Sequence, residues 1–132
     1  MASGSTGCQT VAVSSWLVTG GAGYIGAHVA RAFKTVGITP VVVDDLSSGR
    51  VGLVPPDVPF VQGDILDVDL LTGVLDEYGC AGVVHLAAFK YAGVSVKRPL
   101  HTYTQNVTGT VRVLDAMHRA GVNKLVFSSS AA

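Results

Sequence analysis

The sequence Thr19-Gly20-Gly21-Ala22-Gly23-Tyr24-Ile25-Gly26 decides how this chain folds. It follows the apolar run 16–18 and precedes apolar residues at helical spacing as far as Gly37, a pattern typical of a strand, a tight turn and a helix. Gly20 permits the turn, Gly23 lets the backbone approach a pyrophosphate, and Gly26 lets the helix lie close to the sheet. The first N–H groups of this helix have no partners within it, so the turn predicts an anion-binding site. A glycine-rich turn that binds no ligand is the alternative.

Outward from this turn, strand-like and helix-like segments alternate. We expect strands at 16–18, 40–43, 59–61, 83–86 and 124–128, and helices at 24–36, 67–78 and 99–120. Because the crossovers are long enough for parallel pairing, the predicted class is α/β: a doubly wound parallel sheet (Rossmann fold) with five strands in the order 3-2-1-4-5. The last helix is expected to carry one apolar side, made of Tyr103, Val107, Val111, Leu114 and Met117.

The domain organisation follows from the same pattern. Residues 1–14 are small and polar, and we expect a flexible leader there; residues 15–132 are expected to form the dinucleotide-binding Rossmann domain. Since the sequence ends four residues after the last expected strand, we expect this domain to be incomplete at its C-terminal end. It would then be part of a longer protein, truncated before the substrate-binding part.

Composition excludes several classes of protein. Hydrophobic residues make up 48% of the chain and charged residues 14%, against about 25% charged in average domains, which excludes a disordered chain. Nine Lys and Arg balance nine Asp and Glu, so no nucleic-acid partner is expected. Cys8 and Cys80 have no partners at zinc-site spacing, so no metal is expected. No stretch is apolar for long enough to span a membrane, and we expect a cytoplasmic protein.

A carboxylate at the end of the second expected strand adds to the glycine turn. Asp44 lies 24 residues after Gly20, where an acidic residue can accept both hydroxyls of the adenine ribose and repel a 2′-phosphate. No Lys or Arg follows before Arg50, so the sequence favours NAD over NADP. A carboxylate that only caps a loop is the alternative.

Motifs along the chain resemble one known family. They are TGGAGYIG (19–26), DDLSSG (44–49), GDILD (63–67), VVHLAAFK (83–90), NVTGT (106–110) and VFSSSAA (126–132). In this order they resemble the extended short-chain dehydrogenase/reductases, among them the NAD-dependent epimerase/dehydratase family, and most closely its branch that epimerises UDP-glucose at C4. The resemblance spans residues 16–132. It implies the N-terminal NAD-binding part of an isomerase that interconverts UDP-glucose and UDP-galactose by transient oxidation at C4 and hydride return.

The resemblance also assigns residues to the cofactor. The glycine turn would contact the pyrophosphate, the loop 44–49 the adenosine ribose, residues 64–65 the adenine, residues 86–90 the underside of the dinucleotide, and residue 105 its nicotinamide side. The implied NAD-binding residues are Gly20, Gly23, Tyr24, Ile25, Gly26, Asp44, Asp45, Leu46, Ser47, Ser48, Gly49, Asp64, Ile65, Leu86, Ala87, Ala88, Phe89, Lys90 and Gln105.

Catalytic residues are sparse in this chain. Ser130 matches the family's Ser or Thr that hydrogen-bonds the sugar hydroxyl being oxidised. The family's base, a tyrosine followed four residues later by lysine, has no counterpart here: the residues four after the tyrosines at 24, 78, 91 and 103 are His28, Gly82, Ser95 and Val107. We therefore expect the chain to be inactive alone. A non-catalytic NAD-binding module, or a remnant of a truncated gene, stays open; a 4,6-dehydratase is disfavoured because its acidic pair would fall on Ala131 and Ala132.

Plainer roles stay open for some of these residues. Asp64 could be a turn residue, Lys90 a surface charge and Ser130 a loop hydroxyl. We expect His85 to be a hydrogen-bonded core histidine and Asn106 to hold backbone. The resemblance further implies a nucleotide-sugar substrate and a homodimer for the full-length form.

Overall fold

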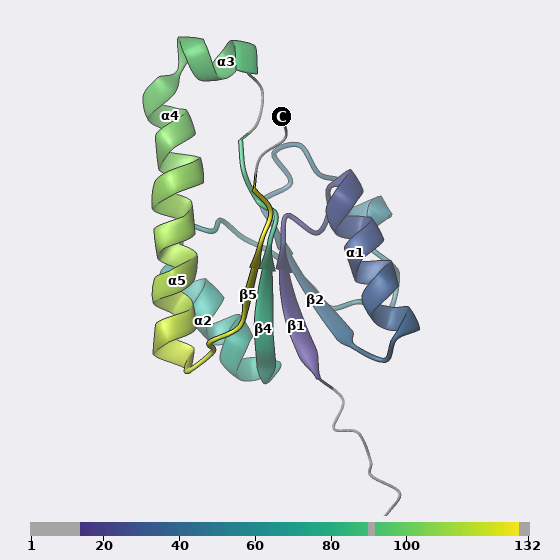
Figure 1. The fold of residues 1–132 in the computed structure, drawn as a ribbon. Coiled ribbons are helices and arrows are strands. Elements are labelled where there is room, and N and C mark those ends of the chain that lie inside the picture. The colour runs from purple at the N-terminus through teal and green to yellow at the C-terminus, as the bar shows by residue number, and fades with distance from the viewer. Residues whose placement is uncertain (1–13, 90–91, 130–132) are drawn as a thin grey trace, which may run out of the picture.

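Five parallel strands form one sheet in the order β3-β2-β1-β4-β5, which confirms the predicted doubly wound topology (Figure 1). The computed structural model describes residues 14–89 and 92–129. Register sets Thr19 beside Val43 and His85, so three neighbouring strands end at one edge of the sheet. The strands are β1 (Ser15–Thr19), β2 (Thr39–Asp44), β3 (Phe60–Gln62), β4 (Cys80–His85) and β5 (Leu125–Phe127).

Helices cover both faces of this sheet. Figure 1 shows α1 (Tyr24–Thr35) on one face, and α2 (Val68–Glu77) with α5 (Gly109–Ala120) on the other. Side chains alternate along a strand, so Leu17 packs in the core beneath α2 and α5, whereas Val18 packs in the core beneath α1. Because both faces are buried there, the central strands β1, β2 and β4 are largely apolar, as parallel strands commonly are.

Local signals set the ends of the helices as the sequence predicts. The Asp67 carboxylate accepts a hydrogen bond from Leu70 N and caps α2. Gly121, with φ 72°, adopts the left-handed conformation that ends α5, and Gly37, with φ 80°, follows α1. These local signals fix where α2 begins and where α1 and α5 end.

The expected helix 99–120 consists of three consecutive segments. They are α4 (Pro99–Tyr103), the π-helical turn η3 (Thr104–Thr108) and α5. A short helix, α3 (Ala92–Lys97), precedes them and was not predicted; its sequence AGVSVK holds glycine, serine and two valines, which are weak helix formers. A 3₁₀ turn, η2 (Val51–Leu53), lies in the loop after β2.

The apolar residues predicted on one side of the last helix do not share one environment. Met117 is buried, whereas Tyr103, Val107, Val111 and Leu114 are exposed. The helix packs instead through small side chains, including Val113 and Ala116. The exposed apolar residues form a surface that we call the outer stripe, made of Leu100, Tyr103, Val107, Val111 and Leu114.

Candidate functional site

Two glycines of the turn between β1 and α1 are required by the fold itself. Gly20 has φ 72°, and a Cβ there would lie 2.8 Å from Ala87 N. At Gly26 a Cβ would lie 2.3 Å from Gly20 O. Both contacts are with backbone, so no side chain can yield to relieve them. Gly26 therefore lets α1 lie close to the turn that follows β1, whereas the sequence predicted a close approach to the sheet.

Gly23 is different, because among the described residues a Cβ there would make a single tight contact. Its backbone is extended (φ −83°, ψ 175°), which any residue can adopt. A Cβ would meet only Gly20 O, at 3.3 Å, a contact that a shift of a few tenths of an ångström relieves. The first helical hydrogen bond runs from Ala27 N to Gly23 O, so the amides of Tyr24, Ile25 and Gly26 precede the helical ladder. A bare Cα in front of these donors suits a large anion.

Asp44, at the end of β2, ties the loop after that strand to the glycine turn. One carboxylate oxygen accepts a hydrogen bond from Ala22 N (3.0 Å) and the other from Leu46 N (2.8 Å). The residue is 8% exposed. A carboxylate has about four acceptor positions, so two remain for hydroxyl groups of a ligand. Asp44 thus does hold the loop, as the plainer interpretation predicted, and keeps capacity for a ribose.

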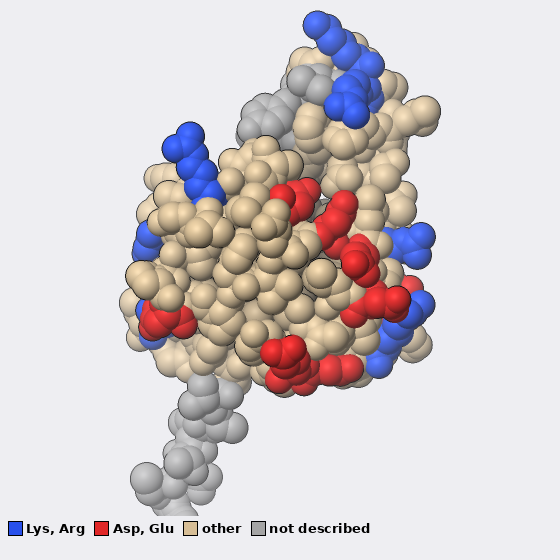
Figure 2. Space-filling model, turned by 180° about the vertical axis from the view of Figure 1, so that it is seen from behind, with Lys and Arg blue, Asp and Glu red and all other residues tan. Residues whose placement is uncertain are grey.

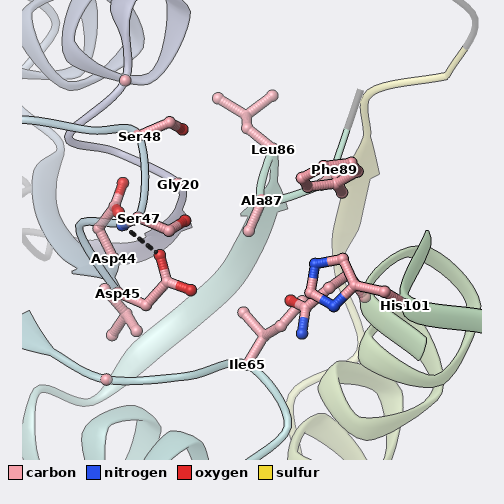
Figure 3. Close-up of a pocket in the computed structure, with 15 residues that line it drawn as sticks. Gly20, Asp44, Asp45, Ser47, Ser48, Ile65, Leu86, Ala87, Phe89 and His101 are labelled. Atoms are coloured by element: carbon pink, nitrogen blue, oxygen red, sulfur yellow. Dashed lines mark hydrogen bonds between the residues drawn. The ribbon is translucent and has the colours of Figure 1, made fainter. Parts of the chain in front are cut away.

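These elements surround a cleft of about 220 Å³ outside the carboxyl ends of the strands, the place where open α/β sheets bind ligands. Figure 3 shows side chains from the loop after β2, from the loop after β4 and from α4 converging on it. The Asp45 carboxylate accepts a hydrogen bond from Ser47 N (2.9 Å) within this lining. The predicted residues that line the cleft are Gly20, Gly23, Asp44, Asp45, Ser47, Ser48, Ile65, Leu86, Ala87, Ala88, Phe89 and Gln105.

Other predicted residues lie outside this lining. The side chains of Tyr24 and Ile25 are 75% and 54% exposed, so only their backbone amides are suited to a phosphate. Asp64 accepts a hydrogen bond from Leu66 N (2.9 Å), as a turn residue does. The lining also leaves out Gly26, Leu46 and Gly49. Lys90 and Ser130 lie outside the described residues.

The loop after β4 is held at both ends by side chains. At its start, Thr19 Oγ1 accepts hydrogen bonds from Leu86 N (3.1 Å) and Ala87 N (3.2 Å). At its end, the Asn106 amide accepts from Phe89 N (2.7 Å) and donates to Phe89 O (2.8 Å). The expectation that Asn106 holds backbone is therefore confirmed. The π-helical turn η3 contains both Asn106 and the cleft residue Gln105.

His85 is the hydrogen-bonded core histidine that the sequence predicts. It is 3% exposed, and its ring nitrogens lie 2.7 Å from Thr19 Oγ1 and 3.2 Å from Thr110 Oγ1. Burial lowers the pKa of His85 to about 4, so the ring is neutral at physiological pH. Burial likewise raises the pKa of the Cys80 thiol to about 11, which leaves it unreactive.

Three cleft residues were not predicted: Val43, Gly63 and His101. The His101 ring packs edge-on against the Phe89 ring, with centroids 5.0 Å apart. A signal for it was available, since His101 stands four residues before Gln105 and helical spacing puts both on one face. The sequence carries no such signal for Val43 and Gly63. They line the cleft because they lie near the carboxyl ends of β2 and β3.

Charge is distributed unevenly around the cleft. Asp44 and Asp45 line it, and none of its described lining residues is Lys or Arg. Figure 2, seen from behind, shows acidic side chains gathered in a band, with Lys and Arg toward the margins. Beside Asp44 and Asp45, uncharged ligand hydroxyls are therefore better suited to this lining than an additional phosphate group.

Two further classes of site have no counterpart in the described part of the chain. Residues 14–89 and 92–129 hold no group of three or more His, Cys, Asp or Glu side chains placed to bind a metal ion. In the same residues no helix has the length and hydropathy needed to cross a membrane.

Comparisons with known proteins agree with this geometry. Residues 16–132 match the family described as the NAD dependent epimerase/dehydratase family. A UDP-glucose 4-epimerase of Azospirillum brasilense is 45% identical over 124 residues, which cover 94% of this chain and 36% of that protein.

Solved structures give the same result. UDP-glucose 4-epimerase from Brucella ovis, in complex with NAD, matches with a TM-score of 0.86 and 41% identity over 90% of this chain and 36% of that one. The enzyme from Thermotoga maritima, solved with UDP-glucose, matches with a TM-score of 0.84 and 34% identity, over 88% and 38%. This chain therefore spans little more than a third of the length of these relatives.

Proposed function

The chain belongs to the NAD-dependent epimerase/dehydratase family, and on that premise we propose that it is the NAD-binding part of a nucleotide-sugar 4-epimerase. The observation that carries the proposal is the bare backbone at Gly23, in front of the first amides of α1 and beside a cleft lined by Asp44. Among the described residues a Cβ at this position would meet one atom, Gly20 O at 3.3 Å, whereas a pyrophosphate that approaches a helix amino end needs the bare backbone. Relatives of the same fold were solved with NAD and with UDP-glucose.

The cleft offers a partner for each part of NAD. The pyrophosphate would rest on the glycine turn and accept hydrogen bonds from the amides of Tyr24 and Ile25. The free acceptor positions of Asp44 would take the adenosine ribose hydroxyls, with Asp45, Ser47 and Ser48 at the rim. The adenine would lie against Ile65, next to the turn held by Asp64. The loop 86–89 would form the floor, with Lys90 and Gln105 toward the nicotinamide.

The proposed reaction exchanges UDP-glucose and UDP-galactose. NAD, when bound, supplies the acceptor that takes a hydride from C4 of the sugar and gives it back to the opposite face. Within this chain, Ser130 would hydrogen-bond the reacting sugar hydroxyl. The apolar groups of Leu86, Ala87 and Ala88, which line the cleft, would keep water away from the reacting carbon.

The base for this reaction is not encoded in these 132 residues. No tyrosine is followed four residues later by lysine, and a positioned base contributes about 10²–10⁴-fold to such a rate. We therefore propose that the 132-residue chain alone does not epimerise. Measurable turnover of UDP-galactose by the purified chain would refute this part of the proposal.

A second candidate function rests on the same absence. Without the Tyr-x-x-x-Lys pair, the chain could act as a non-catalytic NAD-binding module, or be a remnant that has lost binding. NAD affinity of the chain would distinguish such a module from the remnant, which would not bind NAD. A 4,6-dehydratase is the weaker alternative, because Ala131 and Ala132 cannot transfer protons.

We further propose that the longer protein is a cytoplasmic homodimer. The outer stripe supports the dimer: Leu100, Tyr103, Val107 and Val111 expose more than half of their surface, and contiguous apolar surface of this kind is typical of protein interfaces. Light scattering of a longer form that includes the Tyr-x-x-x-Lys pair tests it, and a monomer at micromolar concentration would argue against the dimer.

Thermal unfolding in the presence of nucleotides tests the cofactor assignment. A ligand that binds only the folded chain at one hundred times its Kd stabilises it by about 2.7 kcal/mol, which is about 10 °C in Tm for a chain of this size. NAD should produce such a shift, and NADP a much smaller one because Asp44 and Asp45 oppose its 2′-phosphate. Equal shifts with both nucleotides would refute the assignment of these carboxylates.

A further inference from the structure

A continuous chain of hydrogen bonds passes through the buried ring of His85. On one side of the ring, Thr19 Oγ1 lies 2.7 Å from Nδ1; on the other, Thr110 Oγ1 lies 3.2 Å from Nε2. Thr110 in turn donates to Asn106 O (2.6 Å). The same ring therefore links the two groups that hold the loop 86–89, Thr19 at its start and Asn106 at its end.

The partners of Thr19 settle where the protons lie. Its hydroxyl oxygen accepts hydrogen bonds from Leu86 N and Ala87 N, so its own proton is donated to Nδ1 of His85. The neutral ring then carries its proton on Nε2, which donates to Thr110 Oγ1. Thr110 can accept it, because its own proton goes to Asn106 O. The Leu86 amide is shared between Thr19 Oγ1 and Thr19 O, each at 3.1 Å, whereas each proton of the ring and of the two hydroxyls goes to one acceptor.

We propose that His85 is a positioning residue, which keeps the Thr19 hydroxyl turned so that it accepts the first two amides of the loop 86–89. A hydroxyl proton rotates freely unless an acceptor fixes it, and Nδ1 is that acceptor. The inference rests on the proposed function in one respect, namely that this loop forms the floor of the NAD site.

The position of these amides matters because the loop has no free space beneath the glycine turn. A Cβ on Gly20 would lie 2.8 Å from Ala87 N and 3.0 Å from Ala87 Cα, so the two backbones are already in contact. A loop that moves by half an ångström therefore shifts against the turn that would hold the pyrophosphate. His85 acts on the cofactor through Thr19 and the backbone, and does not line the cleft itself.

Two substitutions separate positioning from packing. In His85→Asn the side-chain oxygen can replace Nδ1 as the acceptor for Thr19, but the ring is lost. In His85→Phe the ring that packs against Phe127, with centroids 5.9 Å apart, is kept, but the acceptor is lost. If His85 only fills space, the phenylalanine variant resembles the wild type more closely; if it positions Thr19, the asparagine variant does. His118→Phe, on the exposed side of α5, is the matched control.

Amide hydrogen exchange on the cofactor-free 132-residue chain gives the first readout. We expect His85→Phe to speed the exchange of Ala87 about tenfold relative to the core of the sheet, with a smaller effect on Leu86, whose amide also donates to Thr19 O. His85→Asn should change the exchange of Ala87 less than threefold. Nitrogen shifts of the wild-type ring give a readout that needs no variant: the Nε2–H tautomer is expected, and the Nδ1–H tautomer would overturn the proposal even if both variants failed to fold.

NAD affinity, measured by calorimetry, gives the second readout. The Kd should rise about tenfold in His85→Phe, less than threefold in His85→Asn, and not at all in His118→Phe. If the loop amides of the two variants exchange in the predicted order but the wild-type chain has no affinity for NAD, the proposed function is refuted and the positioning role is upheld. Equal amide exchange and equal affinity in the two His85 variants would overturn the positioning role whether or not the function holds.

Discussion

Replacing Gly23 and Gly26 separately by alanine distinguishes a glycine kept for a ligand from one kept for the fold. In Gly26→Ala the new methyl would lie 2.3 Å from Gly20 O and 2.6 Å from Gly21 Cα. Since both atoms are backbone, α1 must move away from the turn. Overpacking of this kind costs about 3 kcal/mol in the free energy of unfolding.

Gly23→Ala should behave in the opposite way. Its methyl meets only Gly20 O, at 3.3 Å, and its φ of −83° carries no strain, so the free energy of unfolding should change by less than about 1 kcal/mol. The same methyl projects in front of the α1 amides, where the pyrophosphate is proposed. NAD affinity should therefore fall at least about tenfold, or about 1.4 kcal/mol.

Urea unfolding and NAD titration of both variants make the test. Gly73→Ala is the control: a Cβ there meets nothing within 4 Å, and the exposed position in α2 should gain about 0.5–1 kcal/mol without a change in affinity. A Gly23→Ala chain that binds NAD like the wild type would refute the argument that this glycine serves a ligand. Equal loss of stability at positions 23 and 26 would refute the distinction between them.

Three further predictions follow from the same structure. Burial lowers the pKa of His85 to about 4, from 6.5 for the ordinary group, so the unfolded chain binds a proton on His85 more tightly than the folded chain does. The stability that the neutral ring contributes is therefore fully present above about pH 6.5 and is lost as the pH falls toward 4. At 1.36 kcal/mol per pKa unit the loss is about 3 kcal/mol, and urea unfolding across this range should show a decline that His85→Phe removes; an unchanged slope in that variant would contradict the assignment. Asp44→Asn should destabilise the chain by about 1–3 kcal/mol, because its amide NH₂ would face a backbone N–H of Ala22 or Leu46; unfolding curves check this, and a neutral effect would show that these hydrogen bonds contribute little. The wild-type chain should self-associate through exposed Val126 and Phe127 of β5 and the outer stripe; light scattering should show larger species that Val111→Lys diminishes, whereas a monomer that unfolds in one sharp transition would contradict this.

Much of the fold could be predicted because its signals are local and agree with one another. The β-branched run at 41–43, the Asp67 cap and Gly121 each specify one conformation, and the alternation of strands and helices leaves few topologies. Register at the carboxyl edge then brings Gly20, Asp44 and Leu86 together, although 66 residues separate the first from the last.

The parts that could not be predicted depend on tertiary context. The helix α3 has weak intrinsic preference, and the π-helical turn at 104–108 accompanies the clamp of Asn106 on a loop 17 residues away. The last helix carries two apolar sides, and periodicity alone cannot say that Val113 and Ala116 face α2 while Val107 and Val111 face outward. The resemblance assigns Asp64 to the adenine, and this assignment stays a prediction; in the structure its carboxylate accepts a hydrogen bond from Leu66 N.

Amide chemical-shift mapping during an NAD titration tests most directly whether the dinucleotide binds between the glycine turn and the Asp44 carboxylate at the end of β2. The largest shifts are expected at Tyr24, Ile25 and Leu46, because in the proposed complex the first two amides would face the phosphates and the third would share the carboxylate of Asp44 with the ribose. Shifts confined to the far edge of the sheet, or none at saturating NAD in a folded chain, would contradict the account.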